Sequence, residues 1–246
     1  MLDFPADAAG RVVSTTRLRE PAWRDVCAWF ETIDAIIRGL GHALNNRALA
    51  LSATIESLDP KRPIGNTLSV GLTREAERLT EQLRQLRALP FTVAAEPMPL
   101  LLSDVLASAI QLHRTHASLG NVPVYLEATA SAPPVLAPES SLIHALLVLL
   151  SALKTHASPG GVVRIGCDGT PEAVVITFQS QRDPADAHEP SNGGALIQAA
   201  ALASALLAAT RLEIEQEIGP DSATVTWQLP SLKAMRKRLR EQVAAG

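Results

Sequence analysis

The segment Leu40-Gly-His-Ala-Leu-Asn-Asn-Arg47 carries the side chains best suited to chemistry in this 246-residue chain. A helix turns by about 100° per residue, so His42 would lie on the face opposite to the apolar seam of that helix. Arg38 and Asn46 stand four residues before and after His42, on its own side. Neutral imidazole is a good nucleophile near its pKa of about 6.5 and could attack a phosphoryl group in line. Arg38 or Arg47 could neutralise the phosphoryl oxygens.

The face that carries His42 is also suited to docking a partner. Glu31 and Ala35 extend it towards the N-terminus with small or polar side chains, and one leucine lies beyond His42. The alternative is an ordinary solvated histidine, since the chain has six. The partner-binding residues that we expect are Arg38, Asn45, Arg47, Leu49 and Ala53.

Two helices are expected to position this face. Apolar residues recur every three or four positions after Pro21, which predicts a helix. This first seam consists of Ile33, Ile37, Leu40, Leu44, Ala48, Leu51, Ile55 and Leu58. Two prolines and a glycine in residues 59–65 then break the pattern. A second seam follows at Leu68, Leu72, Ala76, Leu79, Leu83 and Leu86. The two seams predict an α-helical hairpin over residues 21–94.

An isolated hairpin cannot bury both seams. The first helix alone would be on the order of 50 Å long at about 1.5 Å rise per residue. Two hairpins could bury their seams together in a four-helix bundle, so we expect a homodimer. The alternative is that the hairpin packs on the C-terminal part of its own chain.

The rest of the chain has the pattern of a mixed α/β unit. Residues 95–230 predict helices near 100–118, 140–156 and 194–208, and strands near 122–128, 162–167, 173–179, 212–217 and 224–229. This order favours a mixed sheet with helices packed on one face. The fold class that we predict is therefore α+β, a helical hairpin followed by an α/β sandwich. We expect residues 1–20 to form a flexible arm and residues 231–246 a basic C-terminal helix or tail.

Composition excludes several classes of protein. Apolar residues make up 47% of the chain and charged residues 19%, which favours a packed core over disorder. The net charge of −3 does not favour a nucleic acid or membrane partner bound by charge. Cys27 and Cys167 lie far apart, so neither a disulfide framework nor a zinc site is expected. No signal peptide is visible at the N-terminus, and we expect a cytoplasmic protein without a membrane span.

Taken in order, these motifs resemble the core of the bacterial two-component histidine kinases. Residues 40–47 are similar to the H-box of that family, in which a histidine leads an H-x-x-N-N run in some subfamilies. Residues 147–156 with Pro159-Gly-Gly161 resemble the N-box helix and the strand after it. Residues 191–198 resemble the last glycine box, and residues 212–230 the closing hairpin of the ATP-binding domain.

Several positions depart from the family's pattern for ATP. The N-box asparagine that holds magnesium corresponds to Ser151, and the earlier polar position of that helix falls on Leu147. No D-x-G-x-G box follows the strand near 173–179, and the acidic residue after the kinase histidine is replaced by Ala43. A triphosphate without a well-held divalent ion lacks its main neutralising charge. We therefore expect no cofactor and no ATP-driven autophosphorylation.

The resemblance then implies a dimeric histidine phosphotransfer protein with a degenerate, ATPase-like domain. His42 would accept a phosphoryl group from a response-regulator receiver domain and donate it to another, and the receiver would bring its own magnesium. A hybrid histidine kinase is a further candidate partner. Asn46 matches the family position that orients water for phosphatase action, so a receiver phosphatase is the alternative, as is a non-catalytic receiver-binding regulator.

The remaining histidines of the expected ATPase-like domain suggest no site. His113 and His116 are three residues apart, but no third metal ligand is recognisable near them. We interpret them as polar helix residues. His144 and His156 are expected to face solvent or the edge of the sheet.

Overall fold

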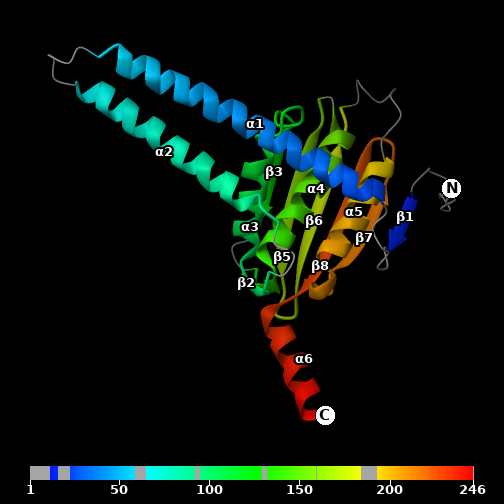
Figure 1. The fold of residues 1–246 in the computed structure, drawn as a ribbon. Coiled ribbons are helices and arrows are strands. Elements are labelled where there is room, and N and C mark those ends of the chain that lie inside the picture. The colour runs from blue at the N-terminus through cyan, green and yellow to red at the C-terminus, as the bar shows by residue number, and fades with distance from the viewer. Residues whose placement is uncertain are drawn as a thin grey trace.

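The computed structural model describes residues 12–15, 23–58, 65–91, 95–128, 132–158, 160–183 and 193–245. Two long helices project together from an α/β body, and a last helix points away from the body in another direction (Figure 1). The helices are α1 Trp23–Glu56, α2 Asn66–Ala88, α3 Leu102–His113, α4 Glu139–Ala157, α5 Gly193–Leu206 and α6 Leu232–Ala245. The strands are β1 Val12–Thr15, β2 Met98–Leu100, β3 Val124–Ala128, β4 Val135–Ala137, β5 Val162–Gly169, β6 Ala173–Gln181, β7 Glu213–Ile218 and β8 Ser222–Pro230.

Helices α1 and α2 confirm the predicted hairpin. Leu44 and Leu51 of α1, like Leu72 and Leu79 of α2, are half-buried along their common side. Other seam positions stay open to solvent in the single chain, including Ile37 and Ile55, which are 44% and 59% exposed. The break between the helices, residues 59–64, lies outside the described residues.

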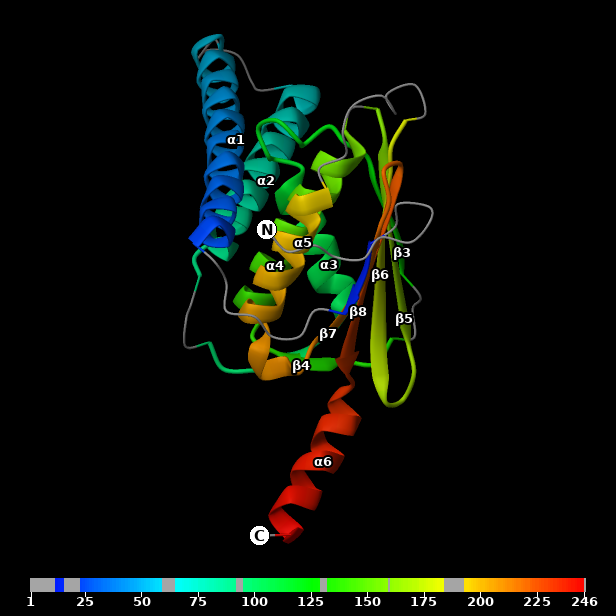
Figure 2. The same cartoon turned by 90° about the vertical axis from the view of Figure 1, so that its right-hand side faces the viewer.

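A six-stranded mixed sheet forms the body. Its strand order is β1-β7-β8-β6-β5-β3, in which β3 and β5 are parallel and all other neighbours are antiparallel. Alternate residues of β8 point into the core, and Val225, Trp227 and Leu229 are fully buried. Figure 2 shows α3, α4 and α5 together on one side of the sheet, with α1 and α2 beyond them. The predicted α+β class, with helices on one face of a mixed sheet, is confirmed.

Helix α4 lies at the centre of the helix layer. Leu142, Leu146, Leu149 and Leu153 recur along it and are all inaccessible to solvent. Among the described residues, α4 is the one helix whose length and hydropathy would suffice to cross a membrane. Because 83% of its apolar window is buried inside the fold, it has the character of a core helix.

The structure corrects three features of the sequence prediction. Residues 12–15, expected in a flexible arm, form β1 and pair with residues 215–218 of β7. The outer edge of β7 offers unpaired backbone N–H and C=O groups, and β1 forms hydrogen bonds with them. Strands β2 and β4, which the sequence pattern does not predict, form a separate two-stranded sheet. Each spans three residues, too few for alternation to be read. Residues 1–11 and 16–20 lie outside the described residues.

The third correction concerns where the hairpin packs. The N-terminal half of α1 contacts α4 and α5 of its own chain, and Ile36 and Leu40 are completely buried there. The alternative of packing on the C-terminal domain therefore holds for this half. The C-terminal half of α1 extends beyond the body with α2 (Figure 1).

Candidate functional site

His42 lies on an exposed strip of α1. His42, Asn45, Asn46, Leu49 and Ala53 are all exposed, and together with Arg38 they make up what we call the His42 strip. The structure places this strip where α1 leaves the body. An imidazole here is accessible to a macromolecular partner, and two amides lie within about one turn of it.

The strip does not continue towards the N-terminus of α1. Ala35 is only 7% exposed, because this part of the helix packs against the body. The expected docking face therefore begins near Arg38. Glu31 is exposed but lines a cavity between α1 and the helices of the body.

The two arginines expected beside the phosphoryl group have carboxylate partners. Arg38 is exposed and forms an ion pair with Asp34 at 3.0 Å, one turn earlier on the same helix. Arg47 pairs with Glu75 of α2 at 2.8 Å, so it connects the two helices of the hairpin. Partial burial alone would raise the pKa of the Glu75 carboxyl, but hydrogen bonds from Arg78 and Arg47 lower it. Arg38 is thus the better placed of the two cations to meet a ligand at the strip.

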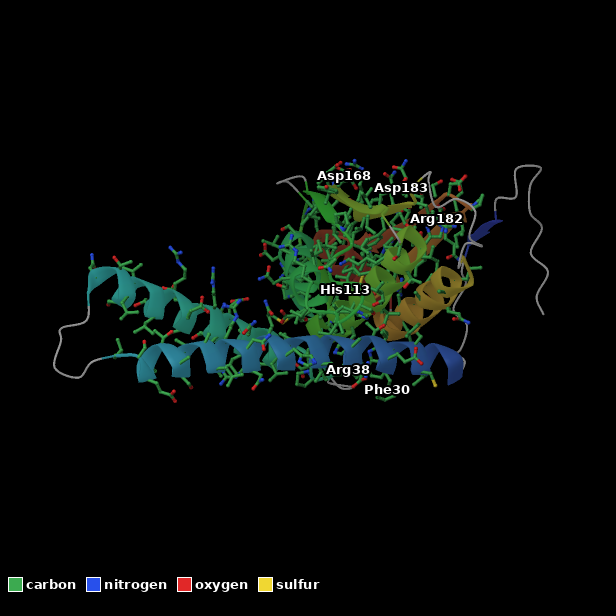
Figure 3. All side chains as sticks on the ribbon, turned by 90° about the horizontal axis from the view of Figure 1, so that it is seen from above. Phe30, Arg38, His113, Asp168, Arg182 and Asp183 are labelled. Atoms are coloured by element: carbon green, nitrogen blue, oxygen red, sulfur yellow. The ribbon has the colours of Figure 1, made fainter. Side chains whose placement is uncertain are left out.

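A cavity of about 470 Å³ lies between α1, α4, α5 and the turn after α3. Its polar lining includes Thr32, Arg38, Ser118, Ser151, Thr155 and Gln198. Ser151 is thus at the cavity, while the Leu147 side chain is fully buried in the core. Figure 3 shows Phe30 and Arg38 on α1, with His113 between that helix and the sheet, where Asp168 lies on β5 and Arg182 follows the end of β6.

Next to this cavity, His113, His116 and Lys154 form a buried basic cluster. His113 Nε2 lies 2.8 Å from the Ser151 hydroxyl, and the rings of His113 and His116 are stacked with centroids 5.0 Å apart. Lys154 is completely buried and donates a hydrogen bond from Nζ to the Leu119 carbonyl oxygen at 3.1 Å. The interpretation of these two residues as polar helix residues needs correction, because His116 lies in the turn after α3 and both side chains are buried.

Burial dominates the ionisation of this cluster. It lowers the pKa of His113 well below its usual value, and the neighbouring Lys154 and His116 lower it further. The pKa of His116 is lowered by burial and then by Lys154 and Arg38. Burial, with Arg114 nearby, lowers the pKa of Lys154 to about 8. Both imidazoles are therefore neutral at pH 7, whereas Lys154 still carries its proton.

His144 and His156 are also core residues, which corrects their expected place at solvent or the sheet edge. Trp29 Nε1–H donates to His144 Nδ1 at 2.9 Å, and His144 Nε2 in turn lies 2.8 Å from the Leu89 carbonyl oxygen. His156 Nε2 lies 3.2 Å from the Gly219 carbonyl oxygen. Burial, the largest cause, lowers the pKa of both rings. Trp29 and His144 thereby connect α1 to α4.

The cavity and the basic cluster were missed from the sequence. One signal could have pointed to them, namely a lysine three residues after Ser151 inside an otherwise apolar helix. No group of three or more histidine, cysteine, aspartate or glutamate side chains that could hold a metal ion occurs among the described residues.

Neither a protein-family model nor a curated protein sequence matches this chain. Solved structures similar to it include the histidine kinase AdeS of Acinetobacter baumannii, with 13% identity and a TM-score of 0.44, over 78% of this chain and 98% of that one. A histidine kinase of Burkholderia phymatum STM815 has 18% identity and a TM-score of 0.45, over 85% and 98% of the two chains. A bacterial phosphotransferase has 16% identity and a TM-score of 0.43, also over 85% and 98%. With such low identities and TM-scores, these likenesses assign no activity to this chain.

Proposed function

We propose that this chain is a histidine phosphotransfer protein of two-component signalling, which takes a phosphoryl group on His42 and passes it on. The observation that carries this proposal is the exposed imidazole on the His42 strip, at the base of a projecting hairpin. The proposed donor and acceptor are aspartates of response-regulator receiver domains. A hybrid histidine kinase that contains a receiver domain is a second source of donor.

The proposed step is an in-line displacement at phosphorus. An unprotonated ring nitrogen of His42 attacks the phosphorus of the receiver's aspartyl phosphate and forms a P–N bond. The P–O bond to the aspartate breaks and its electron pair leaves with the carboxylate, while the other ring nitrogen of His42 keeps its proton. Arg38 could leave its ion pair with Asp34 and neutralise the charge of the phosphoryl oxygens instead. The receiver would supply the magnesium ion.

We further propose that ATP is not the phosphoryl donor. Two observations support this part. The hydroxyl of Ser151 is hydrogen-bonded to His113, and Leu147 is an apolar core residue, so neither offers the amide oxygen that would help to hold a magnesium–nucleotide. Calorimetry with the full chain at millimolar ATP should show no binding heat, and measurable magnesium-dependent binding would contradict this part.

The main experiment uses a receiver domain with radiolabelled phosphate on its aspartate. Label should move to the wild-type chain as an acid-labile, alkali-stable adduct, and His42→Gln should abolish that adduct. Glu77→Gln, which changes an exposed carboxylate of α2, is the matched control and should retain transfer. Failure of every receiver of the same cell to label the wild-type chain would overturn the proposal.

A receiver phosphatase is the second candidate function, favoured by the exposed amide of Asn46 one turn beyond His42. Such an amide could orient a water molecule at the receiver's phosphoaspartate. In that case Asn46→Ala would lose phosphate release while His42→Gln would keep it, and no labelled chain would accumulate. The opposite pattern selects phosphotransfer. Binding of a receiver without any change in its phosphoryl lifetime would instead select a non-catalytic regulator.

We also propose that two hairpins associate. Exposed apolar side chains on α1 and α2 support this, in particular Ile37, Ile55, Val70 and Leu83, which are 44–59% exposed. Burying these side chains against a second copy would stabilise the dimer by removing apolar area from water. Sedimentation equilibrium should give twice the chain mass for the wild type, and Ile55→Glu should shift it towards the monomer. A monomeric wild type at micromolar concentration would contradict this arrangement.

A further inference from the structure

Helix α1 makes its closest approach to the body at Gly39, three residues before His42. A Cβ atom built on Gly39 would lie 1.6 Å from the carbonyl oxygen of Thr115 and 2.8 Å from its carbonyl carbon. Because these are backbone atoms, they cannot rotate away as a side chain could. Any residue other than glycine would have to push α1 and the turn after α3 apart.

Contacts on both sides of Gly39 hold α1 against the same turn. The Ala117 amide donates a hydrogen bond to the Ala35 carbonyl oxygen at 3.2 Å, which joins the turn to the helix backbone. Ile36 and Leu40 flank Gly39 and are completely buried. Glycine weakens the interior of a helix relative to alanine, so its presence here fits a requirement for close packing.

The turn on which α1 rests is itself held by the buried basic cluster. His116 Nδ1 accepts hydrogen bonds from the Leu119 and Ser118 amides, at 3.1 and 3.3 Å. Lys154 of α4 donates to the Leu119 carbonyl oxygen from beneath. The turn is therefore anchored to the core helix by a buried side chain.

Helical geometry relates Gly39 to His42. Three residues correspond to an advance of about 4.5 Å along the axis and a rotation of about 300°, which leaves the two positions about 60° apart around the helix. The side of α1 that touches the turn is thus next to the side that carries His42. A small displacement of α1 at Gly39 changes where His42 stands relative to the body.

We infer that Gly39 is a positioning residue: its missing side chain clamps α1 to the Thr115–Ala117 backbone and so fixes His42 relative to the body for an incoming receiver. The inference rests on the proposed phosphotransfer function for its consequence, though not for the clamp itself. The clamp explains why α1 can be rigid at the point where it leaves the body. It also gives the His116 and Lys154 hydrogen bonds a role in the placement of His42.

The test compares Gly39→Ala with Gly41→Ala, because a Cβ on Gly41 meets nothing within 4 Å. Hydrogen exchange of the Ala117 amide reports the clamp directly, since this amide is bonded to Ala35 across the interface. Gly39→Ala should speed that exchange by at least about tenfold while the Leu119 amide, bonded within the turn, stays protected. Gly41→Ala should leave both amides as in the wild type.

The functional readout separates placement of His42 from its reactivity. Gly39→Ala should lower transfer from a phosphorylated receiver by about 10²-fold, a loss that a misplacement of about 1 Å can cause. Labelling of His42 by a small donor such as phosphoramidate should not change, because that donor needs no docking surface. Equal losses with both donors would show a structural role only and would overturn the positioning role.

Each remaining outcome also decides the proposal. An Ala117 amide that stays protected in a folded Gly39→Ala variant refutes the clamp. If Gly39→Ala does not fold, Ile36→Val takes its place, since it shortens a completely buried side chain next to Ala35, whose carbonyl oxygen accepts the hydrogen bond from the Ala117 amide. That variant should partly deprotect Ala117, and full protection would refute the clamp. If the wild type accepts no phosphate from any receiver, the proposed function fails, and the exchange measurement still tests the clamp.

Discussion

Replacing Lys154 with methionine should make this protein more stable at pH 7. The Lys154 side chain is completely buried on α4, and Arg114 nearby adds to the effect of burial on its pKa. One hydrogen bond to the Leu119 carbonyl oxygen is the contact that offsets these costs. Methionine has similar length and no charge, so it can occupy the same space.

The magnitude follows from the pKa of this lysine. A pKa lowered from 10.5 to about 8 means that the folded state holds the proton less tightly than the unfolded chain. At about 1.4 kcal/mol per unit, the charged form costs about 3 kcal/mol in the folded state. Loss of the hydrogen bond to Leu119 returns about 1 kcal/mol of this. Lys154→Met should therefore raise the free energy of unfolding by about 2 kcal/mol at pH 7.

The sign of the pH dependence gives a second, independent check. Between pH 8 and about 10.5 the unfolded chain keeps the Lys154 proton that the folded chain has released, so the wild type gains stability as pH rises. The methionine variant lacks this gain, and its advantage should shrink by about 3 kcal/mol across that window. All other groups titrate in both proteins and cancel in the difference.

Urea unfolding followed by circular dichroism at pH 7 and pH 10 measures both quantities. Lys233→Met, which changes an exposed lysine of α6, is the control and should alter the free energy of unfolding little at either pH. A Lys154→Met variant that is less stable at pH 7, or whose advantage does not depend on pH, would refute the reasoning.

Two further predictions concern the same core. Burial lowers the pKa of all four buried histidines, which are His113, His116, His144 and His156. Below about pH 6.5 the unfolded chain therefore binds protons that the folded chain does not bind, and the free energy of unfolding should fall. The fall is at most about 1.4 kcal/mol per pH unit for each ring. Urea unfolding at pH 7 and 5.5 measures this fall, and a flat profile would contradict it. Gly161→Ala should destabilise the fold by about 1–3 kcal/mol, because its Cβ would lie 2.2 Å from the carbonyl oxygens of both Ala157 and Gln181. Gly71→Ala, with open space around its Cβ on α2, should be neutral or stabilising when both variants are compared with the wild type by urea unfolding at pH 7.

The hairpin was predictable from the sequence because its apolar residues repeat with the period of a helix. What the period could not show is which neighbour covers each part of the seam. Leu40 is buried against the body, whereas Ile55 in the same seam remains exposed in the single chain. The exposure of His42 could be predicted from its angle to the seam. The burial of Ala35, which ends the docking face, could not be predicted, because it results from the packing of α1 on α4 and α5.

The buried basic cluster was not predictable because polarity is a poor guide to burial when hydrogen bonds satisfy the polar atoms. His113 forms a hydrogen bond with Ser151 of another helix, and Lys154 donates one to a carbonyl oxygen 35 residues earlier in the chain. Neither partner is visible in local sequence. The short strand at residues 12–15 was missed for a related reason, since its partner residues lie near position 217.

That long-range pairing has a consequence for biosynthesis. Strand β1 pairs with residues that follow it by about 200 positions, from Val12 opposite Ile218 to Thr15 opposite Glu215. At a translation rate of about 5–20 residues per second, the ribosome needs roughly 10–40 s to deliver the partner. The helical hairpin, which closes locally, can form during this interval, whereas the sheet is completed only when nearly the whole body has emerged. Until then the backbone N–H and C=O groups of β1 have no partner strand, and this is the stage at which a chaperone would protect the nascent chain most.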